Sequence, residues 1–374
     1  MNFNFHSFLL KTLIILSGIS VLTNCKRKKN VQDHPSAQVG YPAIQVQKEI
    51  PKGVKTPEGM IWVSGKEYMQ GAVADDTLAM HHEKPAHTVA VDGFFIDQTE
   101  VTNAQFAEFV AATKYVTLAE REIKWSELKK QVPPGTPKPH DSILQPGSLV
   151  FKKSKDKLPN LYDYSQWWSW KIGANWKHPY GPDSTIEGKD NYPVVHVTYE
   201  DAMTYCKWAN RRLPTEAEWE LASRGATTNA IYTWENSALP LTNQANTWEG
   251  TFPEMNTKAD GYEGIAPVKS FPANSIGLYD IAGNVWELTQ DWYHVQYYQE
   301  LKDLGTVKNP LGPKKAYNPN NPRIQEKVIR GGSFLCNESY CASYRNSARM
   351  ANALDSSSEH IGFRTVVTPE MLQR

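Results

Sequence analysis

The sequence has no excess of charge of either sign, no long repeat and few cysteines. Its 374 residues include 40 Lys and Arg against 40 Asp and Glu, so the formal net charge is zero at pH 7. A neutral chain has no bulk electrostatic attraction to nucleic acid or to anionic membranes, and we expect no nucleic-acid partner. Neither a sustained heptad pattern nor a fixed-period repeat is present, which argues against coiled coils and solenoids.

The composition is that of a globular protein rich in turns and aromatic side chains. Hydrophobic residues make up 40% of the chain and charged residues 21%, which excludes disorder throughout. The length allows one large domain or two ordinary ones, each with a sizeable core. The 23 glycines, 24 prolines, 12 tryptophans and 18 tyrosines predict many loops around aromatic anchors and little regular secondary structure.

The first 25 residues have the pattern of an export signal. Lys11 precedes the apolar run Thr12 to Leu22, which has the length of a secretory apolar region and is too short to span a bilayer. The next residues, Leu22-Thr23-Asn24-Cys25, resemble a lipobox, although Asn24 is a poorer match than Gly or Ala. We expect residues 1–25 to be a lipoprotein signal peptide with Cys25 lipidated; the alternative is simple cleavage of a secreted protein.

A basic and then polar segment follows the signal. Residues 26–29 are Lys-Arg-Lys-Lys, and the stretch up to about Thr56 is dotted with prolines and lacks apolar periodicity. We therefore expect residues 26–58 to be a flexible tether and residues 59–374 to be the folded domain. Because the basic residues would lie against anionic headgroups, we expect a lipid-anchored protein of the cell envelope that faces the periplasm.

Within the domain, the apolar pattern predicts short elements. Three helices are expected, at residues 104–113, 200–209 and 215–223, and Thr102 and Thr215 are suited to cap the first and the third. Strands are expected at Met60 to Val63, Thr88 to Val91, Phe94 to Ile96, Val194 to Val197 and Lys327 to Arg330.

Three cysteines remain after the signal. Cys206 lies on the apolar face of a predicted helix, where a small buried hydrophobic residue is its simplest role. Cys336 and Cys341 follow the pair Gly331-Gly332, which permits close backbone approach. In an oxidising compartment the two thiols are consistent with a structural disulfide, a redox dithiol, or a two-thiolate site for a soft ion such as Cu(I).

The segment around these two cysteines resembles the active-site segment of the formylglycine-generating enzyme family, also called sulfatase-modifying factors. Five upstream blocks are similar to family blocks in the same order: Glu83 to His87, Phe95 to Asn103, Gly173 to Pro179, Arg212 to Glu220 and Gly277 to Glu287. The resemblance covers nearly everything from Met60 to Val367. Several blocks are shared by non-catalytic relatives, so Cys336 and Cys341 with Ser333 are the discriminating feature.

The resemblance implies one catalytic domain of α+β class, with the formylglycine-generating enzyme fold, an elaborated C-type-lectin-like domain. It also implies two structural calcium ions, for which oxygen-rich segments of this chain are suited. The first site would comprise Asn246, Thr247, Asp260 and Tyr262; the second would comprise Asp280, Gly283, Val285 and Glu287. Without the resemblance, such Asp, Asn and Gly clusters are more often turns.

The activity that the resemblance implies is oxidation of a cysteine in an unfolded sulfatase polypeptide to Cα-formylglycine by O2. Family substrates carry a Cys-x-Pro-x-Arg-like motif. Cys336 and Cys341 would hold Cu(I), and Ser333 would be the active-site hydroxyl near the oxygen pocket. Tyr340 and Arg349 would line the substrate cleft.

Two departures from the family pattern leave the identity of the substrate undecided. Asn337 and Glu338 replace a His-Arg pair seen in some members, and residues 122–150 look like the longer insertion of bacterial members. The alternatives are a non-catalytic envelope scaffold lipoprotein with the same fold, against which both cysteines argue, and a related oxidase acting on another thiol.

Overall fold

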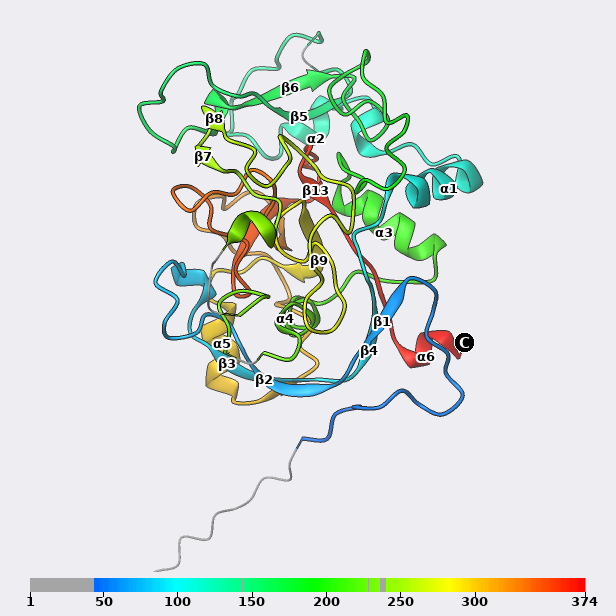
Figure 1. Ribbon diagram of the computed structural model, residues 1–374. Helices are drawn as coiled ribbons and strands as arrows, with labels where there is room; N and C mark the ends of the chain where they lie inside the picture. Colours follow the sequence, from blue (N-terminus) through cyan, green and yellow to red (C-terminus); the bar gives the residue numbers. More distant parts are fainter. Residues whose placement is uncertain (1–43, 143, 228, 236–239, 374) are drawn as a thin grey trace, which may run out of the picture. The chain divides into compact units, whose positions relative to one another are not determined.

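The computed structural model describes residues 44–373 except 143, 228 and 236–239 (Figure 1). The strands are β1 (Met60–Val63), β2 (Lys66–Gln70), β3 (His87–Val91), β4 (Phe94–Asp97), β5 (Gly147–Phe151), β6 (Trp168–Ile172), β7 (Gly250–Thr251), β8 (Met255–Asn256), β9 (Trp286–Trp292), β10 (Val307–Lys308), β11 (Glu326–Arg330), β12 (Arg349–Ala353), β13 (Ile361–Gly362) and β14 (Val366–Val367). The helices are α1 (Asn103–Thr113), α2 (Trp125–Leu128), α3 (Tyr199–Trp208), α4 (Glu216–Arg224), α5 (Tyr297–Leu304) and α6 (Pro369–Leu372).

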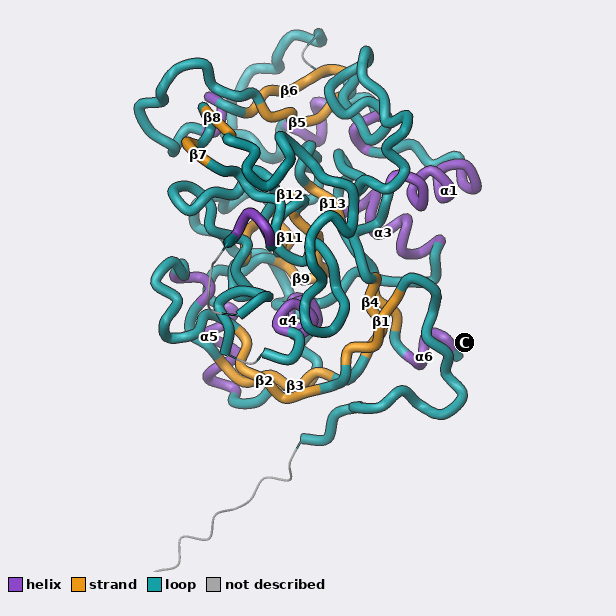
Figure 2. Tube along the Cα trace, viewed as in Figure 1, coloured by secondary structure: helices purple, strands orange, loops and turns teal. Residues whose placement is uncertain are grey.

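The strands form small separate sheets rather than one large one. The order is β12-β11-β9-β13 in the largest sheet, β1-β4-β14 and β10-β3-β2 in two others, and β5-β6 and β7-β8 in two hairpins. Figure 2 shows that loops make up most of the trace between them. The α+β class and the scarcity of regular structure are thus confirmed.

Helix α4 is the central element of the domain. All of its residues are buried, and it packs against β2, β3, β9 and β11 (Figure 1). Thr215 caps the helix by accepting a hydrogen bond from the Glu218 amide, while the Glu218 side chain accepts from the Thr215 amide. This is the predicted capping box, which satisfies amides that a helix start otherwise leaves without partners.

The predicted elements agree with the structure except at one strand and one boundary. Residues 194–197 form no strand, because His196 has a φ of 58°, in the left-handed region, which interrupts an extended segment. The packed unit begins at Ile44, earlier than the expected boundary at residue 59. Gln47 accounts for this, since its amide donates to Asp92 and its carbonyl accepts from Gly65 and Gly93.

The expected signal peptide, its lipidation site Cys25 and the first part of the tether lie outside the described residues. Among the residues that are described, no helix is both long and apolar enough to cross a membrane.

Candidate active site

The two cysteines of interest lie on one loop between β11 and β12, which we call the thiol loop (Gly331 to Ala348). Gly331 and Gly332 open it with φ angles of 90° and 73°, in the region that favours glycine. A Cβ on Gly332 would lie 2.9 Å from the carbonyl carbon of Ser343, so the start of the loop packs directly against its later part. The loop therefore folds back on itself and brings Cys336 and Cys341 together.

The two thiols are free and in contact. Cys336 is buried and Cys341 half-buried, and both are reduced. The Cys336 thiol donates a hydrogen bond to the Cys341 sulfur; this bond lowers the pKa of Cys341, whereas burial first and then the same bond raise the pKa of Cys336. Cys341 is thus the more acidic thiol of the pair.

Ser333 lies beside this pair. Its backbone amide lies 3.4 Å from the Cys336 sulfur, and its hydroxyl lies 3.0 Å from Nδ1 of His360. Burial lowers the pKa of His360 to about 3, so the imidazole is neutral at pH 7. The His360 ring packs against Trp168, with ring centroids 4.8 Å apart. His360, which the sequence did not single out, thus fixes the serine hydroxyl beside the thiols.

Tyr340 belongs to an aromatic cluster next to Cys341. Its ring stacks on Phe252 with centroids 4.5 Å apart and meets Trp167 edge-on at 5.5 Å. Trp248 packs in the same cluster, and its amide donates to the Cys336 carbonyl at 3.0 Å. The indole N–H groups of Trp167 and Trp248 are buried without a protein partner. The aromatic cluster therefore forms one wall beside the thiols.

Arg349 does not line this site, which corrects the expectation from the sequence. Its side chain is buried, and Nε and Nη2 donate to the Glu216 carboxylate at 2.6 and 2.8 Å. Such a two-point contact fixes both groups in one geometry. Arg349 joins β12 to α4 and has a structural role.

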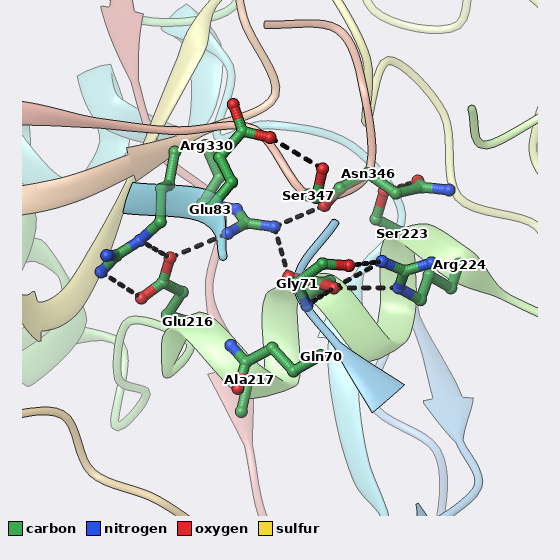
Figure 3. Close-up of polar contacts among 12 residues, drawn as sticks. Gln70, Gly71, Glu83, Glu216, Ala217, Ser223, Arg224, Arg330, Asn346 and Ser347 are labelled. Carbon is green, nitrogen blue, oxygen red and sulfur yellow. Dashed lines mark hydrogen bonds and ion pairs between the residues drawn. The ribbon is translucent and has the colours of Figure 1, made fainter. Parts of the chain in front are cut away.

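Arg349 is part of a buried network of arginines and carboxylates that holds both ends of the thiol loop. Figure 3 shows the part of this network around Arg330, Glu216 and Glu83. Arg330, directly before the loop, donates to Glu216 and Glu220 at 2.8 Å each. Arg345, after the second cysteine, donates to Glu83 at 2.8 Å and to Asp76 at 2.6 Å. The loop that carries the thiols is therefore anchored in the core on each side of them.

The four residues of the first expected calcium site lie together. Both oxygens of Asp260 face the 247–262 backbone, where they accept from the amides of Thr247 at 3.2 Å and Tyr262 at 2.9 Å. Burial raises the pKa of Asp260. Asn246 lies on the same segment and donates through Nδ2 to the Gly264 carbonyl at 2.9 Å. The Thr247 hydroxyl is buried without a partner. These oxygens fit a hard cation.

The second expected site contains two unpartnered carboxylate oxygens. Asp280 Oδ1 and Glu100 Oε2 are buried and have no hydrogen-bond partner. Burial raises the pKa of Asp280 to about 6, and burial together with Asp280 raises the pKa of Glu100. A cation bound here would neutralise these two buried carboxyl groups, so they fit a hard ion. Glu100 was not predicted, because nothing in its sequence neighbourhood distinguishes it from a surface acid.

Glu287, the expected side-chain ligand of that second site, is otherwise engaged. Its carboxylate accepts from Arg364 at 2.7 Å on each oxygen and from the Trp219 indole at 2.7 Å. Gly283 and Val285 lie between Asp280 and Glu287, just before β9. The acids suited to a cation here are therefore Asp280 and Glu100. In the part of the chain that is described, no three His, Cys, Asp or Glu side chains cluster in a way suited to a metal.

Comparison with known proteins identifies the family. The model of the sulfatase-modifying factor enzyme 1-like domain matches residues 46–369. The chain belongs to the sulfatase-modifying factor family. A relative from Mycobacterium tuberculosis, named formylglycine-generating enzyme, is 44% identical over 77% of this chain and 91% of its own length. Another of that name from Thermomonospora curvata is 41% identical over 83% of this chain and 94% of its own.

Family membership alone does not decide activity. A mouse relative named inactive C-alpha-formylglycine-generating enzyme 2 is 35% identical over 82% of this chain and 84% of its own length. Among solved structures, PvdO from Pseudomonas aeruginosa has a TM-score of 0.54 at 20% identity, covering 83% of this chain and 94% of that one. This likeness supports the fold; activity has to be argued from the residues of the site.

Proposed function

We propose that this protein oxidises a cysteine of an unfolded sulfatase polypeptide to Cα-formylglycine with O2. The observation that carries the proposal is the pair of free, touching thiols on a loop anchored in the core at both ends. Relatives named formylglycine-generating enzyme, bacterial and mammalian, support an oxidase of this kind.

The reaction exchanges a C–S bond for a C=O bond. In the overall balance the substrate thiol, O2, two electrons and two protons give the aldehyde, hydrogen sulfide and one water. The balance requires two electrons and two protons from an added thiol reductant. Cu(I), when bound, supplies the one-electron chemistry by which O2 reacts.

The residues present fit Cu(I). Cys336 and Cys341 are soft ligands already in contact, and Cys336 is buried. As thiolates they would hold the ion, and both thiol protons would pass to the solvent. His360 keeps the Ser333 hydroxyl oriented toward the same space, and Tyr340 with its aromatic neighbours closes one side. Ser333, His360 and Tyr340 would thus orient and enclose the reacting groups without reacting themselves.

Calcium is proposed as a structural ion at the two oxygen-rich sites. Asn246, Asp260 and the carbonyls of Thr247 and Tyr262 would hold the first ion. Asp280, Glu100 and the carbonyls of Gly283 and Val285 would hold the second. The first ion would close the 246–262 loop and the second would join Glu100 to the 280–285 segment, so both would stabilise the fold and take no part in the reaction.

Lipidation at Cys25 and a periplasm-facing position on the envelope remain part of the proposal, on the sequence pattern alone. Mass spectrometry of the mature N-terminus tests it. A diacylglyceryl-modified Cys25 is expected, and an unmodified terminus beyond residue 25 would contradict it.

The test of function is turnover of a Cys-x-Pro-x-Arg peptide by protein incubated with Cu(I), O2 and a thiol reductant. Mass spectrometry should show an aldehyde in place of the thiol. Cys336→Ser and Cys341→Ser should each abolish it, because one thiolate does not make the two-coordinate site. Cys206→Ser is the matched control, since this buried cysteine lies outside the loop, and it should leave turnover unchanged.

Three other outcomes are informative. Cysteines found as a permanent disulfide in the folded protein, with no aldehyde formed, would favour the scaffold lipoprotein. Copper binding without peptide turnover would favour an oxidase acting on another thiol. Turnover retained in both cysteine variants would contradict the proposed site.

A further inference from the structure

The hairpin β5-β6 has one closed edge and one open edge. Lys152 donates to the Trp167 carbonyl and Gly173 to the Pro146 carbonyl, at 2.8 and 2.9 Å, so these residue pairs face one another across the ladder. Because antiparallel partners alternate, Ser169 and Lys171 also direct their backbone groups inward to β5. The backbone N–H and C=O groups of Trp168, Trp170 and Ile172 therefore point away from the hairpin.

The opposite edge, on β5, is occupied. The Leu149 amide donates to the Ser357 carbonyl at 3.2 Å, and its carbonyl accepts from Glu359 at 3.1 Å. The Phe151 amide donates to the Glu359 carboxylate at 2.7 Å. Within the described chain, the backbone groups of Trp168, Trp170 and Ile172 have no hydrogen-bond partner, whereas the Lys171 carbonyl also accepts from the Ala174 amide at 3.1 Å. The open edge is thus confined to β6.

The open edge is apolar and unprotected. Trp170 and Ile172 have exposed fractions of 43% and 48%. Edge strands are commonly protected by proline, bulges or charges that prevent pairing, and β6 contains no proline and no register shift. The side chain of Lys171, its single charge, lies along Gly181, on the face opposite Trp170. Solvent-exposed apolar residues on such an edge favour pairing with another extended chain.

The edge leads directly to the candidate active site. The Trp168 ring packs on His360, whose Nδ1 lies 3.0 Å from the Ser333 hydroxyl. At its other end, Trp170 lines a cavity of about 830 Å³ together with Gly147, Ser357 and apolar side chains of the 118–144 segment. The edge therefore spans from the catalytic serine to a cavity that could receive side chains.

We propose that the open edge of β6 binds the substrate polypeptide by strand addition, pairing with residues that flank the target cysteine. The inference rests on the proposed function, because an unfolded polypeptide supplies the unpaired, extended backbone that the edge requires. Outward groups on Trp168, Trp170 and Ile172 offer up to six hydrogen-bonding positions over about 13 Å of strand. Main-chain pairing recognises extended chain whatever its side chains, and alternate side chains would face the cavity beside Trp170.

The first test compares the KM of a core peptide of about seven residues with that of a peptide extended by about eight residues on each side. Ile172→Pro removes one outward N–H without breaking the ladder to β5, and it should raise the KM of the long peptide about 3- to 10-fold, the loss of one hydrogen bond. The core peptide should be unaffected. Ile172→Ala, which keeps the N–H, is the matched control for the lost side chain. Equal effects of the proline on both peptides would overturn the inference.

The second test leaves the protein unchanged and separates this inference from the proposed function. A long peptide with Ser in place of the target Cys is N-methylated at successive flanking positions, and its binding to metal-free protein is measured by fluorescence anisotropy. Strand addition predicts weaker binding at every second position only. Equal weakening at all positions, or none, would overturn the inference even where the enzyme turns over. Alternating weakening without any turnover would uphold it and refute the proposed reaction.

Discussion

The thiol loop and the arginine network below it lie next to one another but differ in kind. The loop holds two free thiols, a serine and a histidine that meet through a few contacts. The network holds Arg330, Arg345 and Arg349 against Glu216, Glu220 and Glu83 with nearly every polar atom paired. The reactive side chains lie on the thiol loop, whereas the arginine network holds that loop rigidly in position.

This difference between the loop and the network explains how a relative can keep the family's fold after losing its activity. A buried ion pair broken on one side leaves a charge without compensation, so network residues are tied to folding. A thiol changed to serine should leave the fold intact and remove the proposed reaction. The two regions can therefore be separated experimentally, and the following predictions do so in order of decreasing effect.

Breaking the network at Glu216 should have the largest effect. Glu216→Ala leaves Arg330 and Arg349 buried without their main partner, at a cost of about 3–5 kcal/mol in the free energy of unfolding. Chemical denaturation measures it. The matched control is Glu200→Ala, which removes an exposed pair with Arg121 and should cost at most about 1 kcal/mol. Equal costs for the two variants would refute the role assigned to the network.

Calcium removal should come next. A ligand bound only by the native state at about 100 times its Kd contributes about 2.7 kcal/mol, so a chelator should lower the melting temperature by several degrees. Asp260→Ala and Asp280→Asn should each make the protein less sensitive to the chelator, since each removes a ligand of one site. Exposed Asp183→Asn should respond like wild type. If a chelator leaves the melting temperature of the wild-type protein unchanged, neither proposed site holds a stabilising calcium ion.

His360 should affect rate but not copper binding. His360→Leu removes the side-chain partner of the Ser333 hydroxyl and leaves the Leu335 amide that donates to it, so kcat should fall about 3- to 10-fold, the loss of one hydrogen bond, with Cu(I) affinity unchanged. His360→Asn, which can still reach the hydroxyl with a polar atom, should recover part of the loss. If Ser333→Ala and the double variant with His360→Leu differ in kcat, the two residues do not act through one contact.

The smallest effect concerns pH. Burial raises the pKa of Glu359 to about 8, while its carboxyl holds the Phe151 amide on β5. The native state then keeps a proton that the unfolded chain loses near pH 4.5, so this group makes stability fall as the pH rises from about 4.5 to about 8. Glu359→Gln should match wild type near pH 5 and exceed it near pH 8 in thermal melts. A variant equally or less stable at pH 8 would show that the carboxyl is ionised in the native protein.

The sequence was most informative where the signal is local. The helix caps at Thr102 and Thr215 follow from a short pattern of side chains, and all three helices form as expected. The cysteine pair is also local, since both thiols lie on one loop. Family blocks added the α+β fold.

Contacts between segments distant in sequence could not be predicted from the sequence. From the sequence, Arg349 and Tyr340 look equally suited to line a substrate cleft. Only the structure shows that Arg349 forms a buried ion pair with Glu216, 133 residues away. His360 reaches Ser333 from another segment, and Glu100 meets Asp280 across the core. His196 adopts a left-handed backbone that no propensity predicts, so the expected strand at 194–197 is absent.

The most direct test of the central claim is the amount of Cu(I) bound per chain, measured by competition with a coloured Cu(I) chelator under reducing conditions. The account predicts one Cu(I) per chain in wild type and in Cys206→Ser, and marked loss of affinity in both Cys336→Ser and Cys341→Ser, with all four proteins folded. A folded wild-type protein that binds no Cu(I), or binds it equally well without either thiol, would contradict the claim that this cysteine pair is a metal-holding catalytic site.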